Sequence, residues 1–485
     1  MHQFREKGKL ILWFGFMCTT LALTGCTMVG PDYTPPEKKL PESWKGESMG
    51  VIHRAPDRDV LAEWWSTLND PILSDLMKKA VANNPDLGQA RARIREQRAR
   101  RNISRAGLFP TLDASGSHRK SRSSEEMGSG KEADVYSADV DASWELDIFG
   151  GNRRSLEAAT AELEAGEEDL RDVLVSLLAE VALNYTDVRV LQARMDVVEK
   201  NIVLQDQARE LAQSLYDSGL SGGLEMQQAK YNLENTRSQV PLLRISLEEA
   251  KNRIALLLGE APGSVHGALK THVKVPVCPP EIAIGVPADV LRQRPDIRRA
   301  ERKLAAQTAR IGAATADLYP KLSLTGSIGY ESLDPDRLFL AGSRSWGFGP
   351  RITWPIFRAG SIRSNIEVQS ALQEELLGRY ESVVLNALGE VENQLTVYME
   401  EQIRKQNLKE ARQAAMLALD LALNQYQAGM TDFSDVLDAQ RSLLSFEENL
   451  IQSEGNIVSG LVRLYKALGG GWTLFPAGSG SEKQE

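Results

Sequence analysis

One cysteine near the N-terminus stands in a context that supports covalent modification. Leu23-Thr24-Gly25-Cys26 follows a basic stretch and an apolar stretch from Leu10 to Leu23, which is the pattern of a secretory signal. The tetrapeptide matches the bacterial lipobox, in which the cysteine thiol is the nucleophile that receives a diacylglyceryl group. We therefore expect residues 1–25 to be a signal peptide and Cys26 to carry lipid; an ordinary signal with a chance cysteine is the alternative.

The other reactive side chains are not spaced for catalysis or metal binding. After the signal the histidines are scattered: His53, His118, His266 and His272. The sequence has no HExxH, GxSxG or P-loop string. Cys278 is left without a disulfide partner once Cys18 leaves with the signal and Cys26 is capped. We expect no enzyme, no metal site and no cofactor.

The charge balance argues against a nucleic-acid partner. The 485 residues contain 57 Lys and Arg against 66 Asp and Glu, a formal charge of -9. Binding to nucleic acid needs a clustered basic face, and an overall excess of acidic residues argues against such a partner. After residue 25 no apolar stretch approaches the length of a membrane-spanning helix.

An internal repeat with a spacing of 210 residues organises the chain. Four pairs of segments keep this spacing: Asn84–Leu87 with Arg294–Ile297, Leu108–Leu112 with Leu318–Leu322, Tyr216–Gly219 with Tyr426–Gly429, and Leu258-Gly259 with Leu468-Gly469. Two copies indicate a fused pair rather than a solenoid. We expect a lipidated N-terminal arm at 26–60, a first repeat at 61–259, a linker at 260–287, a second repeat at 288–470 and a flexible tail at 471–485.

Each repeat predicts the same series of elements. A proline at the first helical turn begins a helix at Pro85 and at Pro295. Two strands follow in each copy, at 111–119 and 135–148, then at 321–330 and 345–354. A very long helix and a returning helix complete each copy, at 152–217 and 224–258, then at 360–428 and 433–468. A helix of this length measures about 100 Å, which suits a coiled assembly better than a compact domain.

The strands alternate between apolar and polar residues, most clearly at 135–148. Tyr136, Val140, Trp144 and Ile148 share one face, while acids occupy the other: Asp139, Asp141, Glu145 and Asp147. The length of each run suits a tilted strand that crosses a bilayer, although a soluble sheet with one wet face is the alternative. Four strands are too few to close a barrel, and an open sheet edge is not tolerated in hydrocarbon. Several copies of the chain must therefore contribute strands to one barrel. Two copies would make a filled eight-stranded barrel, and three would leave a lumen.

Apolar residues in the returning helices repeat every seven positions. One stripe in the second copy consists of Val436, Leu443, Leu450, Ile457 and Leu464. The first copy has the equivalent residues Met226, Leu233, Val240, Leu247 and Ile254. A heptad repeat of this length predicts a left-handed supercoil of packed helices.

Eight strings in order along the chain resemble the TolC-type outer-membrane efflux proteins, in the NodT-like lipoprotein branch. They are Val29–Tyr33, Trp64-Trp65, Asp70-Pro71, Ser143–Gly150, Leu291–Ile297, Trp354–Phe357, Leu437–Leu443 and Tyr465–Trp472. The resemblance implies a mainly α fold with a membrane β-barrel: a homotrimer whose twelve-stranded barrel continues into an α-helical periplasmic tube. It also implies a periplasmic adaptor and an inner-membrane transporter of the resistance-nodulation-division (RND) type as partners.

The resemblance also assigns roles to the helical turns and to one charged pair. It implies adaptor contact at two Tyr-x-x-Gly turns, which are Tyr216 with Gly219 and Tyr426 with Gly429; simple helix ends are the alternative. It implies a gate at Asp438 and Arg441, with Asp435 as a further charge, against an ordinary solvated pair. The first copy has Gln228 and Tyr231 at the positions of that pair.

These features together predict a passive exit duct. We expect it in the outer membrane of a Gram-negative bacterium, anchored by lipid, with most of the chain in the periplasm. Thr27 follows the cysteine, whereas an Asp there tends to retain lipoproteins in the inner membrane. The expected cargo is drugs or other small molecules, and a duct for a type I protein secretion system is the alternative. A purely structural coiled-coil lipoprotein would not need four alternating strands.

Overall fold

The computed structural model describes residues 28–37, 41, 44, 61–127, 130–277 and 292–472. The predicted signal peptide, Cys26, Cys278 and the tail beyond residue 472 lie outside the described residues. The chain forms two compact units. The first takes the described residues up to Glu37, Arg93–Glu167 and Arg299–Glu381, and the second takes those of Lys38–Ala92, Glu168–Arg298 and Ser382 onward. Each unit therefore contains segments of both repeats.

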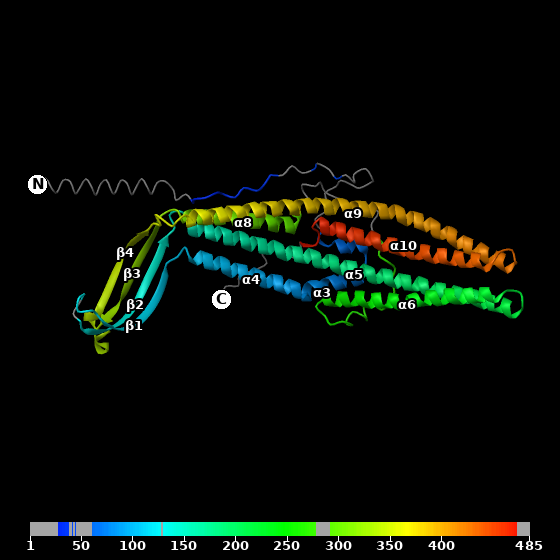
Figure 1. The fold of residues 1–485 in the computed structure, drawn as a ribbon, viewed down its shortest axis with the longest axis horizontal. Coiled ribbons are helices and arrows are strands. Elements are labelled where there is room, and N and C mark those ends of the chain that lie inside the picture. The colour runs from blue at the N-terminus through cyan, green and yellow to red at the C-terminus, as the bar shows by residue number, and fades with distance from the viewer. Residues whose placement is uncertain are drawn as a thin grey trace. The chain divides into compact units, whose positions relative to one another are not determined.

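The first unit contains a four-stranded antiparallel sheet in the order β1-β2-β3-β4 (Figure 1). Its strands are β1 Thr111–Arg122, β2 Glu132–Leu146, β3 Lys321–Ser332 and β4 Arg344–Thr353. All four lie within a few residues of the predicted ranges. The connection from β3 to β4 contains two short 3-10 helices, η3 Pro335–Arg337 and η4 Ala341–Ser343. The pairing of β2 with β3 joins the hairpins of the two repeats into one sheet.

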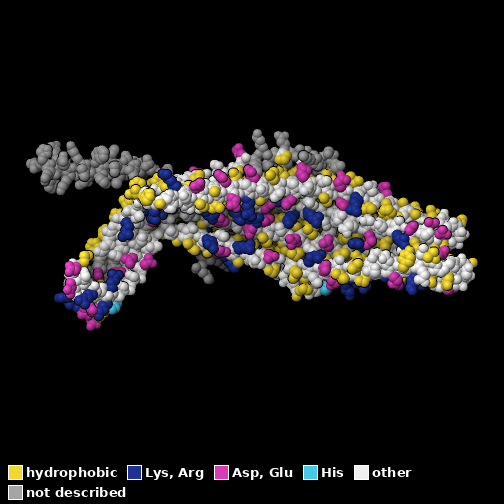
Figure 2. Space-filling view, viewed as in Figure 1, with side chains coloured by type: hydrophobic (Ala, Val, Ile, Leu, Met, Phe, Trp, Pro, Cys, Tyr) yellow, Lys and Arg dark blue, Asp and Glu magenta, His cyan; other side chains and the backbone are white. Residues whose placement is uncertain are grey.

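The register of the strands gives the sheet one apolar and one polar face. Val140 lies opposite Ile328, which lies opposite Trp346, and all three side chains are exposed. The neighbouring pair Asp141 and Ser327 falls on the other face, because successive residues of a strand point to opposite sides. Figure 2 shows charged side chains gathered at the end of the sheet where β1 connects to β2. The ion pair between Lys120 and Glu132 lies there.

Helical segments complete the first unit, and they pack through small and polar side chains. They come from α4 Pro85–Ala106, α5 Gly151–Asp217, α8 Pro295–Ala316 and α9 Ser361–Gln427. Ala161 of α5 is buried against Ala305 and Ala306 of α8. Arg302 and Arg310 of α8 form ion pairs with Glu164 and Glu162 of α5.

The second unit is a bundle of helices around an extended apolar core. It adds η2 Trp64–Leu68, α3 Pro71–Asn83, α6 Gly223–Leu257 and α10 Phe433–Ala467 to the remaining parts of α4, α5, α8 and α9. The four long helices match the predicted ranges within one or two residues. Val436, Leu443, Ile457 and Leu464 of the predicted heptad stripe are buried. Trp64 stacks on Tyr465 with ring centroids 5.5 Å apart. Within the described part of the chain, no helix combines the length and apolarity needed to cross a membrane.

Equivalent residues of the two repeats make equivalent hydrogen bonds. The indole N–H of Trp144 donates to the carbonyl of Leu108 at 3.1 Å, and Trp354 donates to Leu318 at the same distance. At the end of the returning helices, the Asn84 amide donates to the carbonyl of Leu257, and the Arg294 guanidinium donates to that of Ala467. The duplication therefore extends from the strings of residues to their tertiary contacts.

Candidate functional site

Three of the four predicted lumen acids lie on the polar face of the sheet. Asp139 pairs with Ser115 and Gly329 of the neighbouring strands, and Glu145 pairs with Ser323. Asp141 lies directly opposite Asp113 of β1, and like charges in this position destabilise a sheet unless cations screen them. Asp113 is an acid that the sequence prediction missed. The alternation of Asp113, Ser115 and Ser117 on β1 was the signal that could have revealed it.

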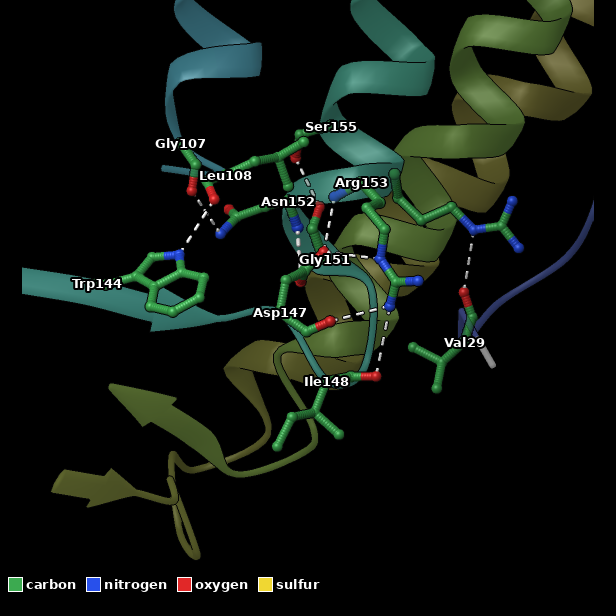
Figure 3. Close-up of polar contacts among 11 residues, drawn as sticks. Val29, Gly107, Leu108, Trp144, Asp147, Ile148, Gly151, Asn152, Arg153 and Ser155 are labelled. Carbon is green, nitrogen blue, oxygen red and sulfur yellow. Dashed lines mark hydrogen bonds and ion pairs between the residues drawn. The ribbon is translucent and has the colours of Figure 1, made fainter. Parts of the chain in front are cut away.

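Asp147, the fourth predicted lumen acid, lies outside the sheet and has a different environment from the other three. β2 ends at Leu146, and the chain turns into α5 through Gly150, whose φ is +80°. The Asp147 carboxylate accepts from the backbone N–H groups of Asn152 at 3.0 Å and Arg153 at 2.9 Å. It also accepts from Arg153 Nε at 3.2 Å (Figure 3), and only 11% of its side chain is exposed. It therefore satisfies the free donors at the start of α5, where a negative charge is stabilising.

The two Tyr-x-x-Gly turns have the same backbone. Gly219 and Gly429 have φ values of +71° and +70°, a conformation that glycine adopts without steric cost. In each turn the glycine N–H bonds back to the carbonyl of the tyrosine, at 2.9 and 3.0 Å. The following residue, Leu220 or Met430, bonds to the carbonyl five positions earlier, which is the helix-ending pattern of a Schellman motif.

The tyrosines of the two turns have different environments. Tyr216 is 45% exposed, whereas Tyr426 is 7% exposed. The Tyr426 hydroxyl donates to the carboxylate of Glu225 at 2.7 Å, and its ring lies 5.1 Å from that of Phe433. Burial, together with the nearby Glu225 carboxylate, raises the pKa of Tyr426. Tyr216 is thus the accessible tyrosine of the pair, and Tyr426 belongs to the core of its turn.

The structure brings Asp438 and Arg441 together and attaches the arginine to the first repeat. Arg441 Nη1 lies 3.3 Å from Asp438 Oδ1 on the same face of α10. Arg441 Nε donates to Asn232 Oδ1 at 3.1 Å, and Nη2 donates to the Tyr231 hydroxyl at 3.3 Å. The arginine thus links α10 to α6. Asp435 is not part of this group, because its carboxylate accepts from the hydroxyl of Thr431.

Tyr231 and Asn232 are the contacts of Arg441 that sequence reasoning did not assign. Tyr231 occupies the position of Arg441 in the first repeat, because the two differ by the repeat spacing of 210. Equivalent positions of the two repeats thus touch each other. A polar cavity of about 460 Å³ adjoins the pair, and its lining includes Asn232, Arg441, Gln205 and Glu448. The side chains of Gln205 and Asn232 are themselves buried.

This chain combines a sheet that has an exposed apolar face with two helices of 67 residues. These features are typical of outer-membrane duct proteins. The family model described as outer membrane efflux protein matches the chain twice, at residues 76–260 and 286–470. The chain belongs to this family and is therefore an outer-membrane protein. The family resemblance expected from the sequence is confirmed, and so is the fold class.

Known relatives cover almost the whole chain. The toluene efflux pump outer membrane protein TtgF of Pseudomonas putida is 32% identical over 466 residues, which are 93% of this chain and 95% of TtgF. Nodulation protein T of Rhizobium leguminosarum bv. trifolii is 31% identical and covers 90% of this chain and 92% of its own. Among solved structures, the outer-membrane channel OprN matches with a TM-score of 0.87 and 35% identity, covering 92% of this chain and 99% of its own.

Proposed function

We propose that this chain is the outer-membrane exit duct of a tripartite efflux pump and conducts drugs or other small molecules passively. The observation that carries this proposal is the sheet. One of its faces is polar and acidic, and the other exposes Val140, Ile328, Trp346 and Phe348. In water such an exposed apolar face is unfavourable, whereas a lipid bilayer covers it.

Closure of the sheet in a membrane requires further copies of the chain. Among the described strands, β1 and β4 each have one neighbour in the sheet, and unpaired backbone groups are not tolerated in hydrocarbon. Three copies supply twelve strands and leave room for a lumen, which the acids of the polar face line. The long helices of the same three copies form the periplasmic tube in this proposal.

The proposal also assigns contacts to the turns between the long helices and to the N-terminus. In this proposal Tyr216, Gly219 and Gly429 contact a periplasmic adaptor, and Tyr426 supports its turn from within. Asp438 and Arg441 close the tube, and an inner-membrane RND-type transporter supplies the cargo. A lipid on Cys26 anchors the mature N-terminus in the outer membrane.

Two adjacent residues of β3 test the membrane assignment. Ile328 lies on the apolar face and Ser327 on the polar face. A lysine on the lipid side of a membrane barrel costs about 2–4 kcal/mol near the middle of the bilayer, whereas a lumen lysine costs little. We expect Ile328→Lys to abolish assembly of the trimer in outer-membrane fractions, and Ser327→Lys to assemble normally. Equal assembly of the two variants would contradict a bilayer on the apolar face.

Reconstitution in planar bilayers tests conduction. We expect the purified trimer to form cation-selective channels, because Asp113, Asp139, Asp141 and Glu145 face the lumen in this proposal. Replacing Asp113 and Asp141 by Asn should lower the ratio of cation to anion permeability. The matched change Asp147→Asn should leave this ratio unchanged, because that carboxylate is bound to α5. A protein that stays monomeric and non-conducting would overturn the duct.

A further inference from the structure

A short segment directly after the predicted lipidation site lies in fixed contacts within the first unit. The backbone N–H of Val29 donates to the carbonyl of Phe149 at 3.1 Å. Gly30 has a φ of +87° and packs so closely that a Cβ on it would overlap the Cα of Gly312 in α8. Met28 packs against Gly150, the residue before α5, so closely that a Cβ on Gly150 would meet it at 2.7 Å. The backbone of this segment is therefore held at the turn between β2 and α5.

Arg154 of α5 binds this segment through its guanidinium group. Its side chain is only 2% exposed, and burying a guanidinium is costly unless its donors are satisfied. Nε donates to the carbonyl of Val29 at 3.2 Å (Figure 3). Nη2 donates to the carbonyl of Gly30 at 3.4 Å and to Asp32 Oδ1 at 2.7 Å. Nη1 donates to Glu157 at 2.8 Å, so the segment supplies three of these four acceptors.

Tyr33 holds the far end of the segment. Its ring packs against the alanine cluster that Ala161 forms with Ala305 and Ala306. Its hydroxyl donates to Glu301 at 3.4 Å, and the Arg302 guanidinium lies 5.8 Å from its ring centroid. Backbone, guanidinium and ring contacts thus hold the segment at both of its ends, from Met28 to Tyr33.

We propose that residues 28–33 form a clamp that holds the acyl chains of Cys26 against the foot of the sheet. This inference rests on the lipid anchor of the proposed function. Two residues of extended chain span at most about 7 Å, so Cys26 cannot lie farther than that from Met28. Beside the clamp, Ile148 is exposed and Phe149 stacks on Tyr319 at 4.6 Å. These apolar side chains continue the lipid-facing surface and are the docking surface for the acyl chains.

A clamped anchor has a different function from a loose one. A long tether would only keep the protein near the membrane. An anchor fixed at the turn between β2 and α5 also sets the height at which the sheet enters the bilayer, because the acyl chains and the apolar face then start at the same level. Arg154 is a positioning residue in this arrangement, since it acts through residues 28–33 and does not contact lipid.

Hydrogen exchange in the full-length protein tests the clamp. Gly30→Ala should speed amide exchange in a peptide covering residues 28–37 by at least about tenfold. The substitution weakens the contacts that hold this segment, and the exchange rate rises as the segment detaches more often. Gly360→Ala is the matched control: its φ is +85°, but nothing lies within 4 Å of an added Cβ. We expect the control to leave exchange in the arm unchanged. Wild-type exchange at the rate of an unstructured peptide, or equal rates in wild type and Gly30→Ala, would overturn the clamp.

Photo-crosslinking tests the docking surface of the acyl chains. Cells are fed a palmitate analogue with a diazirine near its carboxyl end, and crosslinked peptides of the purified protein are mapped by mass spectrometry. We expect crosslinks to peptides containing Ile148-Phe149 or Tyr319, and their loss in Gly30→Ala. An unchanged crosslink pattern in Gly30→Ala would overturn the placement. If no analogue enters and wild type behaves as Cys26→Ser, the anchor itself is overturned, while the exchange result still decides whether the clamp exists.

Discussion

The α5–α6 turn and the α9–α10 turn have the same backbone, but their tyrosines differ in environment. Tyr216 projects from the first turn with nearly half its surface exposed, and Tyr426 is buried in the second between Phe433 and Glu225. The surroundings of Arg441 show a related inequality, because this residue of the second repeat donates to Tyr231 and Asn232 of the first. A duplicated sequence can therefore keep its fold while one copy supplies stability and the other supplies accessible surface.

The largest expected effect is on the stability of the second turn. Tyr426→Ala removes a buried aromatic side chain, which costs about 3–5 kcal/mol. Tyr216→Ala should cost less than about 1 kcal/mol, because that ring is largely solvated. Hydrogen exchange of peptides covering each turn in the assembled protein measures both. Equal loss of protection in the two turns would break the comparison. In a pull-down with the cognate adaptor, Tyr216→Ala should be the variant that weakens binding while leaving its turn intact.

Gly219 and Gly429 provide a control in which the two turns should respond equally. Gly219→Ala and Gly429→Ala should each destabilise their turn by about 1–2 kcal/mol, because the left-handed conformation is unfavourable for alanine. No atom lies within 4 Å of an added Cβ at either position, so strain is the whole effect and should be equal. Hydrogen exchange of the peptides covering each turn measures this destabilisation. A much larger effect in one turn would mean that the backbones are less alike than their φ values indicate.

The charged pair at α10 should have a smaller effect per subunit. Arg441→Ala removes the links to Asp438, Tyr231 and Asn232; since the arginine is half exposed, we expect about 1 kcal/mol per subunit. That amount shifts a closed–open equilibrium roughly fivefold for each subunit. Single-channel conductance should rise in Arg441→Ala and in its double variant with Asp438→Ala. Tyr231→Phe should raise it less, and Gln228→Ala should not change it. Unchanged conductance in an intact double-mutant trimer would return the pair to an ordinary surface contact.

The smallest effect is a dependence on pH. Burial raises the pKa of Tyr426 above the ordinary value of a tyrosine, which is about 10, and the Glu225 carboxylate contributes. The neutral hydroxyl is thus favoured in the folded turn, so its contribution is complete below pH 10 and decreases as pH rises toward the folded pKa. We expect the melting temperature of wild type to fall more steeply above pH 10 than that of Tyr426→Phe. Parallel curves would show that the hydroxyl does not titrate differently in the folded turn.

Most elements of the fold were predictable because their signals are local. Alternation over 135–148 located β2, and proline at the first turn located the starts of α4 and α8. The heptad stripe through Val436 and Leu443 correctly identified the buried face of α10. Alternation did not predict the contacts of Asp147, because it does not show where a strand ends. Once the chain turns at Gly150, that carboxylate meets the free N–H groups of α5 instead of the polar face.

By itself the sequence determined the duplication, the strands, the long helices and the family, since all of these depend on residue types at regular spacings. Only the tertiary structure decided that Tyr426 is buried while Tyr216 is exposed, although both stand in the same four-residue signature. It also decided that Arg441 reaches Tyr231, and that Arg154 holds the arm at Val29 and Asp32. Burial and contact depend on which distant segments pack together, and a local pattern carries no information about its distant partners.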